Sequence, residues 1–292
     1  MSNIEKPEPT TRQEQMDYIV GRLTEFGVRI TPSSRIGRAQ RVLARPETIQ
    51  PDDPDDDAYE IALESIRDNY QLRLIVDTMD AHRESMAFND AMHLLRKGCK
   101  LPQEDSGDNP GRNYQFQLYV AALCMNAGLA TRHEEPDITC DIDGTTFGIA
   151  AKRMKTIDSL EGNVKGAAKQ IFDAGYPGVI ALDLSIAQNR TNRRVMSAIE
   201  RQLYLPLSDA RSRELFKQHG DRIRELADGK NVLGVWTYVS TLRLMSDRTW
   251  SHDCWSCWFD TTRNAEEDAL FEQFQKGFLK GVPNLNDLTE AS

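Results

Sequence analysis

The sequence predicts an α/β protein in which a helical N-terminal region precedes a domain with a mixed central sheet. Residues 10–100 carry apolar side chains at helical spacing, as in Met16, Ile19 and Leu23. Farther along the chain, helical segments alternate with apolar runs too short to be helices. Asp143-Gly144 lies between strand-forming residues, which is a strong short-range signal for a β-hairpin.

The composition is that of a soluble globular protein. Of 292 residues, 39% are hydrophobic and 28% are charged. No apolar run approaches the roughly 18 to 20 residues that span a bilayer, and Met1–Arg12 lacks the apolar core of a signal peptide. The five cysteines are scattered and form no disulfide framework. We therefore expect a cytoplasmic protein without a membrane segment.

Two polar segments divide the chain. Residues 45–57 contain three prolines and five aspartates and break the N-terminal helices. Residues 101–111 contain two prolines and two glycines and have the composition of a linker. We predict a helical domain over residues 1–105 and an α/β domain over residues 112–292.

The elements of the second domain follow from periodicity, turn residues and run length. They are a helix over 113–126 that stops at Gly128, a strand and hairpin ending at Arg153, a helix from Asp158, a buried strand over 178–184, helical sequence over 191–228 interrupted near Pro206, a strand over 232–242 and a helix over 266–280.

The most informative residues flank the predicted hairpin. Asp137, preceded by Pro136, lies at the start of one strand, and Lys152 lies near the end of its neighbour. The hairpin brings both to one end of the sheet. A carboxylate beside a lysine suits metal-assisted phosphodiester hydrolysis, because the acid binds a divalent cation and the ammonium orients water or stabilises phosphate charge.

These residues resemble the motif of the restriction-endonuclease-like superfamily, which is Pro-Asp, a spacer, then Asp or Glu, any residue, and Lys. Pro136-Asp137 and Lys152 match it, and Phe147–Ile149 has the composition of the expected strand. The resemblance covers roughly residues 112–185. It implies a restriction-endonuclease-like α-β-β-β-α-β core and a metal-dependent nuclease.

The chain departs from the family pattern at two positions. Ala150 stands where the family has its second carboxylate. The family also often has a glutamate on the helix before the sheet, and Gln117 is the best candidate for that position. Gln117 is either this active-site position or a polar group at the edge of the core.

The cofactor that the resemblance implies is Mg²⁺ (or Mn²⁺), bound by Asp137 with Glu161 or Glu135. Some members carry the second acid on the following helix, where Glu161 lies, whereas Glu135 lies at the strand start. Glu161 has another interpretation, as the capping-box residue of a helix that begins at Asp158, with Lys165 as its partner one turn later. Magnesium sites function with one or two carboxylates plus waters and substrate phosphate.

Basic residues follow the motif. Residues 151–250 contain 17 Lys or Arg against 11 Asp or Glu, a balance of +6, whereas residues 1–110 contain 14 against 21, a balance of −7. Such a distribution is typical of a phosphate-binding face, although lysines and arginines also decorate solvated helix faces. The residues expected to contact nucleic acid are Arg153, Lys155, Lys165 and Lys169, and the resemblance gives Gln170 a place beside the catalytic residues.

We expect a metal-dependent nuclease acting on DNA, in restriction, repair or defence against foreign DNA. The alternative is a catalytically degenerate nuclease-fold module that binds nucleic acid or a partner protein. Residues 1–105 would supply the contact with a protein partner, and cleavage of both strands would call for a homodimer. The sequence contains no phosphate-binding loop, dinucleotide fingerprint, zinc-protease helix or nucleophile elbow.

Overall fold

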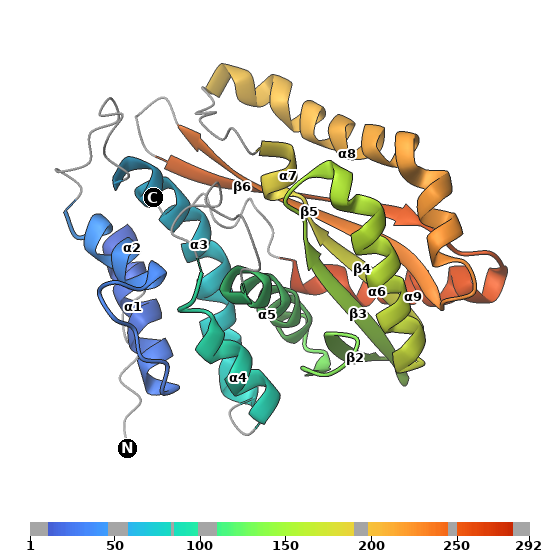
Figure 1. Cartoon of the computed structure of the whole chain (residues 1–292), viewed down its shortest axis with the longest axis horizontal. Helices are drawn as coiled ribbons and strands as arrows, with labels where there is room; N and C mark the ends of the chain where they lie inside the picture. Colours follow the sequence, from blue (N-terminus) through green and yellow to red (C-terminus); the bar gives the residue numbers. More distant parts are fainter. Residues whose placement is uncertain are drawn as a thin grey trace.

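The chain folds around a mixed β-sheet with helices on both faces (Figure 1). The structure is a computed structural model that describes residues 11–45, 58–82, 85–98, 110–189, 198–244 and 250–282. Its elements are α1 (Arg12–Glu25), α2 (Arg35–Leu43), α3 (Ala58–Thr78), η2 (Met79–His82), α4 (Met86–Leu94), α5 (Pro110–Asn126), β1 (Ala130–Arg132), β2 (Ile138–Ile142), β3 (Thr145–Arg153), η4 (Ile157–Ser159), α6 (Leu160–Ala174), β4 (Gly178–Asp183), α7 (Ser185–Asn189), α8 (Ala198–Ala227), β5 (Val232–Leu244), β6 (Trp250–Asp260), α9 (Ala265–Phe278) and η5 (Leu279–Gly281).

The predicted α/β class with a mixed sheet is confirmed. The strands lie in the order β1-β2-β3-β4-β5-β6. The β3–β4 and β4–β5 pairs are parallel, and the other three pairs are antiparallel. Helices α6 and α8 connect the parallel strands, because parallel neighbours require a crossover.

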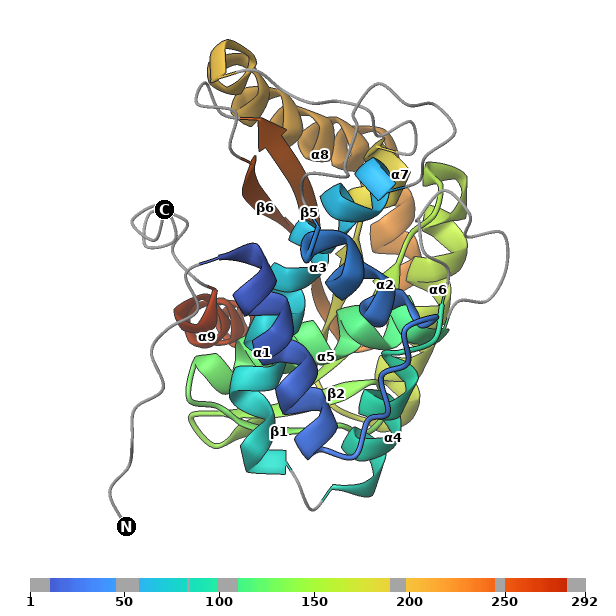
Figure 2. The same ribbon diagram turned by 90° about the vertical axis from the view of Figure 1, so that its left-hand side faces the viewer.

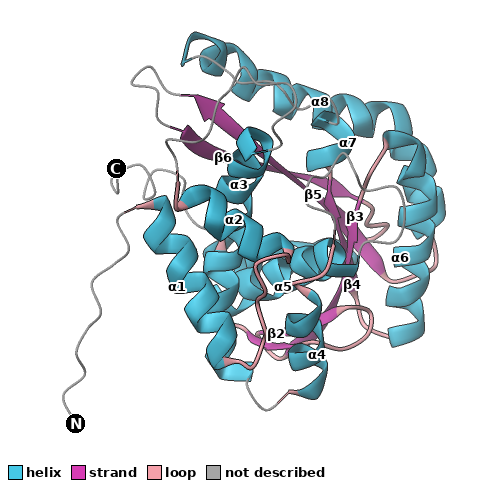
Figure 3. Ribbon diagram, turned by 60° about the vertical axis from the view of Figure 1, so that its left-hand side comes forward, coloured by secondary structure: helices cyan, strands magenta, loops and turns pink. Residues whose placement is uncertain are grey.

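The two faces of the sheet bury separate apolar clusters. Along β3, Ile149 and Ala151 pack in the cluster that includes α5, whereas Ala150 packs in the cluster that includes α6. This alternation is the period of two of a strand that is covered on both sides. Figure 3 shows the resulting layers, with the sheet between α6 and α8 on one side and α5 with the N-terminal helices on the other.

The predicted hairpin joins β2 to β3. Asp143 and Gly144 both have positive φ, at 47° and 84°, as the two central residues of a type I′ turn require. The turn pairs Ile142 with Thr145 and Ile138 with Ile149. Its register therefore fixes which residue of β3 lies opposite the start of β2.

The N-terminal helices pack against the α/β part (Figure 2). Helix α3 contacts α1, α2 and α5, and one apolar cluster contains Met16 of α1, Phe88 of α4 and Phe147 of β3. Residues 99–109 lie outside the described part of the chain. The domain boundary predicted there stays a prediction, but side chains from before and after it share one core.

Three sequence predictions differ from the structure in detail. Helix α6 begins at Leu160, and its N-cap Ser159 makes no side-chain capping bond, so the predicted capping box is wrong. Helix α8 runs over 198–227 without the interruption predicted near Pro206. Strand β6 was not predicted, because its aromatic, cysteine and polar residues do not alternate simply.

The helices of the described segments include none that is both long enough and apolar enough to cross a membrane.

Packing of α9 on the sheet yields the first prediction. A Cβ on Gly234 of β5 would collide with the ring of Phe271 and lie 2.9 Å from the backbone oxygen of Phe259. A Cβ on Gly166, inside α6, would meet no packing neighbour among the described residues. We expect Gly234→Ala to lower the free energy of unfolding by about 1–3 kcal/mol through overpacking.

The matched control, Gly166→Ala, should raise the free energy of unfolding by up to about 1 kcal/mol, because alanine is the better helix former. Urea titration of both variants measures the effect. Equal stability of the two variants would contradict the close packing of β5 against α9.

Candidate functional site

The structure brings Asp137 and Lys152 into direct contact. The Nζ atom of Lys152 donates to Oδ2 of Asp137 at 2.9 Å. The backbone N–H of Ala151 donates to the same oxygen at 2.8 Å, and Nε2 of Gln117, from α5, donates to Oδ1 at 3.0 Å. Three donors from β3 and α5 therefore fix the carboxylate, and the predicted proximity of Asp137 to Lys152 is confirmed.

Close backbone packing sets the approach of Asp137. The preceding Pro136 is buried, and a Cβ on Gly148 of β3 would lie 3.0 Å from two atoms of its ring. A glycine at this position lets the chain before β2 lie against β3. Asp137, which immediately precedes β2, therefore lies beside Ala151 and Lys152 of β3.

The site is partly accessible to solvent. The side chains of Asp137 and Lys152 retain 12% and 21% of their exposure. Burial raises the pKa of the Asp137 carboxyl above its ordinary value, although Lys152 and the N–H of Ala151 oppose this, and the charge of Glu135 adds to the rise.

Residue 150, where the resemblance would place a second carboxylate, is closed to a charged group. Ala150 is 0% exposed and packs in an apolar cluster with Val164 of α6 and Ile180 of β4. An unpaired carboxylate at residue 150 would lose its hydration there. Strand alternation places Lys152 on the same face as Ala150, two residues farther along β3.

The other two candidate metal residues differ in position. Glu161 is exposed and accepts from Nε of Arg222 on α8 at 3.0 Å, so it belongs to the contact between α6 and α8. Glu135 is exposed, and its charge makes a minor contribution to the raised pKa of Asp137. Within the described residues, no three His, Cys, Asp or Glu side chains form a group that could hold a metal ion.

The residues predicted to contact nucleic acid lie at the end of β3, just after it, and on α6. Arg153 follows Lys152 directly, Lys155 lies two residues after Arg153, and both are half-buried. Lys165 and Lys169 lie exposed on α6, where Lys169 pairs with Asp173.

Gln170, also on α6, is half-buried. Among the described hydrogen bonds, none joins Gln170 to Asp137 or Lys152. The glutamine that contacts Asp137 is Gln117, which the sequence indicated as the candidate for the helix position before the sheet.

Neither a protein-family model, nor a curated protein, nor a solved structure matches the chain.

The electrostatics of Asp137 predict how stability depends on pH. Because its folded-state pKa is raised, the folded protein binds this proton more tightly, and stability falls as the pH rises from the unfolded pKa near 4 through the folded value. Asn does not titrate. We expect the melting temperature of Asp137→Asn, relative to wild type, to rise as the pH increases above about 4, as thermal melts would measure.

Asp141 provides a control of opposite sign. Hydrogen bonds from Arg132 and Thr146 lower the pKa of Asp141 to about 2, so its ionised form stabilises the fold above the unfolded pKa and this stability is lost as the pH falls through about 2. Asp141→Asn should therefore lose stability relative to wild type as the pH rises. The same pH trend in both variants would overturn the assigned electrostatics of Asp137.

Proposed function

We propose that this protein is a metal-dependent nuclease that hydrolyses phosphodiester bonds, most directly in DNA, at Asp137 and Lys152. The observation that carries the proposal is the 2.9 Å contact between these side chains, which come from sequence positions 15 residues apart. The order α5-β1-β2-β3-α6-β4 supports it, because the resemblance to restriction-endonuclease-like proteins implies the same order of helices and strands.

The proposal includes one hard divalent cation. Asp137 would offer a carboxylate that is oriented by Gln117 and Ala151, and the exposed Glu135, two residues earlier in the chain, would offer the second. Mg²⁺ and Mn²⁺ prefer such oxygen ligands and keep several waters. When bound, the ion would polarise a phosphoryl oxygen and lower the pKa of a coordinated water.

The protein's own residues would act on the phosphate as follows. Lys152 supplies a positive charge that stabilises the negative charge developing on the phosphate. Asp137 lies beside it and holds the ammonium near the end of β3. Gln117 holds the opposite carboxylate oxygen, so the orientation of Asp137 does not depend on Lys152 alone. When a phosphate draws Lys152 away, two donors still hold the carboxylate.

A second candidate function is a nuclease-fold module that binds nucleic acid or a partner protein without cleaving it. Two observations favour it. Ala150 lies among apolar residues, and both oxygens of Asp137 already accept hydrogen bonds. This function predicts salt-sensitive DNA binding that does not depend on magnesium. The resemblance suggests restriction, repair or defence against foreign DNA as the setting for either function.

Cleavage of supercoiled plasmid tests the first function. With Mg²⁺ or Mn²⁺, we expect wild type to nick or linearise the plasmid. Lys152→Ala should reduce the rate about 10²- to 10³-fold, the usual loss when one charge-stabilising group is removed. The control is Lys276→Ala on α9, which removes an exposed lysine paired only locally with Glu272 and should leave the rate unchanged.

Equal rates for wild type and Lys152→Ala would exclude Lys152 from the reaction. Metal-independent DNA binding without cleavage by wild type would favour the non-catalytic module instead.

A further inference from the structure

A polar cavity lies between the N-terminal helices and the sheet. Residues of α3 and α5 line one side, and Arg153, Asp183 and Ser185 line the other. Arg153 and Asp183 are register partners at the carboxyl ends of the parallel strands β3 and β4. Ligands of α/β proteins bind outside the carboxyl ends of such strands. The cavity therefore occupies a position where a ligand site is expected.

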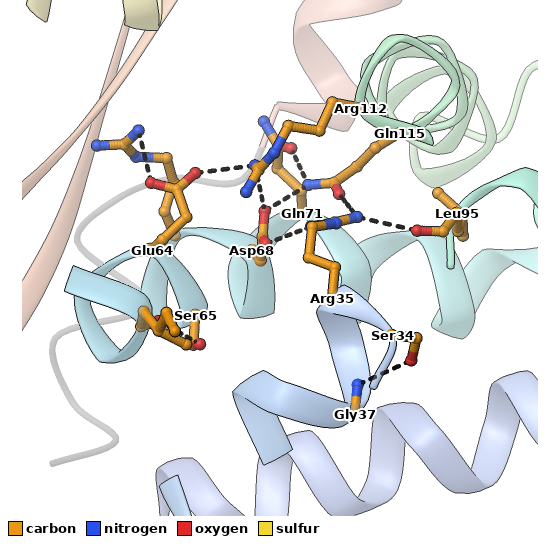
Figure 4. Close-up of polar contacts among 12 residues, drawn as sticks. Ser34, Arg35, Gly37, Glu64, Ser65, Asp68, Gln71, Leu95, Arg112 and Gln115 are labelled. Carbon is orange, nitrogen blue, oxygen red and sulfur yellow. Dashed lines mark hydrogen bonds and ion pairs between the residues drawn. The ribbon is translucent and has the colours of Figure 1, made fainter. Parts of the chain in front are cut away.

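The helical side of the cavity is a buried network of charges centred on Asp68. Figure 4 shows Arg35, Arg112 and Gln115 converging on its carboxylate. Nη1 of Arg112 donates to Asp68 at 3.3 Å and also to Glu64 at 2.9 Å. Burial alone would raise the pKa of Asp68, but the guanidiniums of Arg35 and Arg112 lower it below its ordinary value. Asp68 therefore stays ionised in this network.

The acceptors of this network are already occupied. Asp68 accepts from Arg112 and Gln115 through Oδ1 and from Arg35 through Oδ2. The two oxygens of Glu64 contact Arg112 and Arg67 respectively. The cavity thus presents carboxylates that need no further donor, and a cation would find few free ligands.

Two side chains that line the cavity can still donate a hydrogen bond to a ligand. The side chain of Arg67 is 8% exposed, and its buried Nε atom has no hydrogen-bond partner among the described residues. The Oγ atom of Ser185 accepts from the N–H of Ser240 at 2.9 Å, which leaves its own O–H as a donor. A buried donor without an acceptor is costly, so a ligand that offers acceptor oxygens would complete the site.

Charge and size narrow the ligand class. Three arginines (67, 112 and 153) and three carboxylates (64, 68 and 183) line the cavity. Arg35, which is not part of the lining, pairs with Asp68, so the lining and this fourth arginine together carry one net positive charge. The cavity is partly open, with about 20 Å³ available to water. Since one water needs about 10–15 Å³ by this measure, the space admits one or two oxygen atoms of a larger group outside it.

We infer that this cavity binds a phosphate group, with Arg67 donating to an oxygen that enters it and Arg153 and Ser185 contributing from the strand ends. Guanidinium groups are the side chains best suited to phosphate oxygens. Strand alternation directs Lys152 and Arg153 to opposite faces of β3. The phosphate site is therefore separate from Asp137 and Lys152, although adjacent residues of one strand supply both.

Titration with inorganic phosphate tests this inference on the full chain. At constant ionic strength set with chloride, phosphate should raise the melting temperature of wild type, and calorimetry should give a saturable affinity. Arg67→Lys keeps the charge beside Glu64 but removes the Nε donor. We expect it to bind phosphate about tenfold more weakly or worse, the loss of one charge-assisted hydrogen bond.

Arg263→Lys is the matched control. Arg263 is exposed, pairs with Glu267 and Asp228, and is not one of the residues that line the cavity. It should bind phosphate as wild type does. Arg153→Lys is the second variant if Arg67→Lys fails to fold, and it should also weaken binding. Unchanged phosphate affinity in the folded variants, or stabilisation no greater than that from chloride, would overturn the inference.

A competition experiment identifies the kind of molecule whose phosphate the cavity binds. A short single-stranded oligodeoxynucleotide without terminal phosphates displaces inorganic phosphate from wild type if the cavity holds a nucleic-acid backbone, an assignment that rests on the proposed function. If inorganic phosphate binds and the oligodeoxynucleotide does not displace it, the ligand of the cavity is free phosphate or a phosphorylated small molecule. Asp137→Asn should bind phosphate as wild type does. Failure of the proposed nuclease function, seen as absence of cleavage, is therefore distinguishable from failure of this inference, seen as absence of phosphate binding.

Discussion

The ion-pair network around Asp68 is the interaction on which the arrangement of the helices over the sheet depends. It joins α2 through Arg35, α3 through Asp68 itself and α5 through Arg112. Removing one partner from such a buried network typically costs about 3–5 kcal/mol, because an uncompensated charge remains. Helix α5 also carries Gln117, which donates to Asp137. The network therefore fixes the helix that orients the candidate catalytic carboxylate, and it forms one wall of the polar cavity.

The packing of Ala150 limits the chemistry of the site. Because residue 150 lies within an apolar cluster, the sheet provides one carboxylate, Asp137, directly beside Lys152. Glu161 is engaged with Arg222 on the outer helices, and Glu135 contributes its charge from an exposed position. Under the proposed function, a cation bound here would depend on water and on a substrate phosphate for its remaining ligands. Metal and nucleic acid should consequently bind more tightly together than apart.

Local signals predicted much of the fold. The Asp143-Gly144 turn predicted the hairpin and, through its register, the contact between Asp137 and Lys152. Long-range polar contacts were not predictable in the same way. Asp68 and Arg112 belong to helices in which charged residues usually mark a solvated face, and only the tertiary fold buries them together. Glu161 is the opposite case. The local sequence predicted a capping role, but its side chain instead pairs with Arg222 of α8, 61 residues farther along the chain.

The most direct test of a metal-dependent site with one principal carboxylate is calorimetric titration of Mn²⁺ into the full chain, alone and with a cleavage-resistant DNA duplex. The account predicts weak binding alone, an affinity at least about fivefold higher with DNA, and loss of both in Asp137→Asn. Mn²⁺ binding that is the same with and without DNA, or that survives Asp137→Asn, would contradict it.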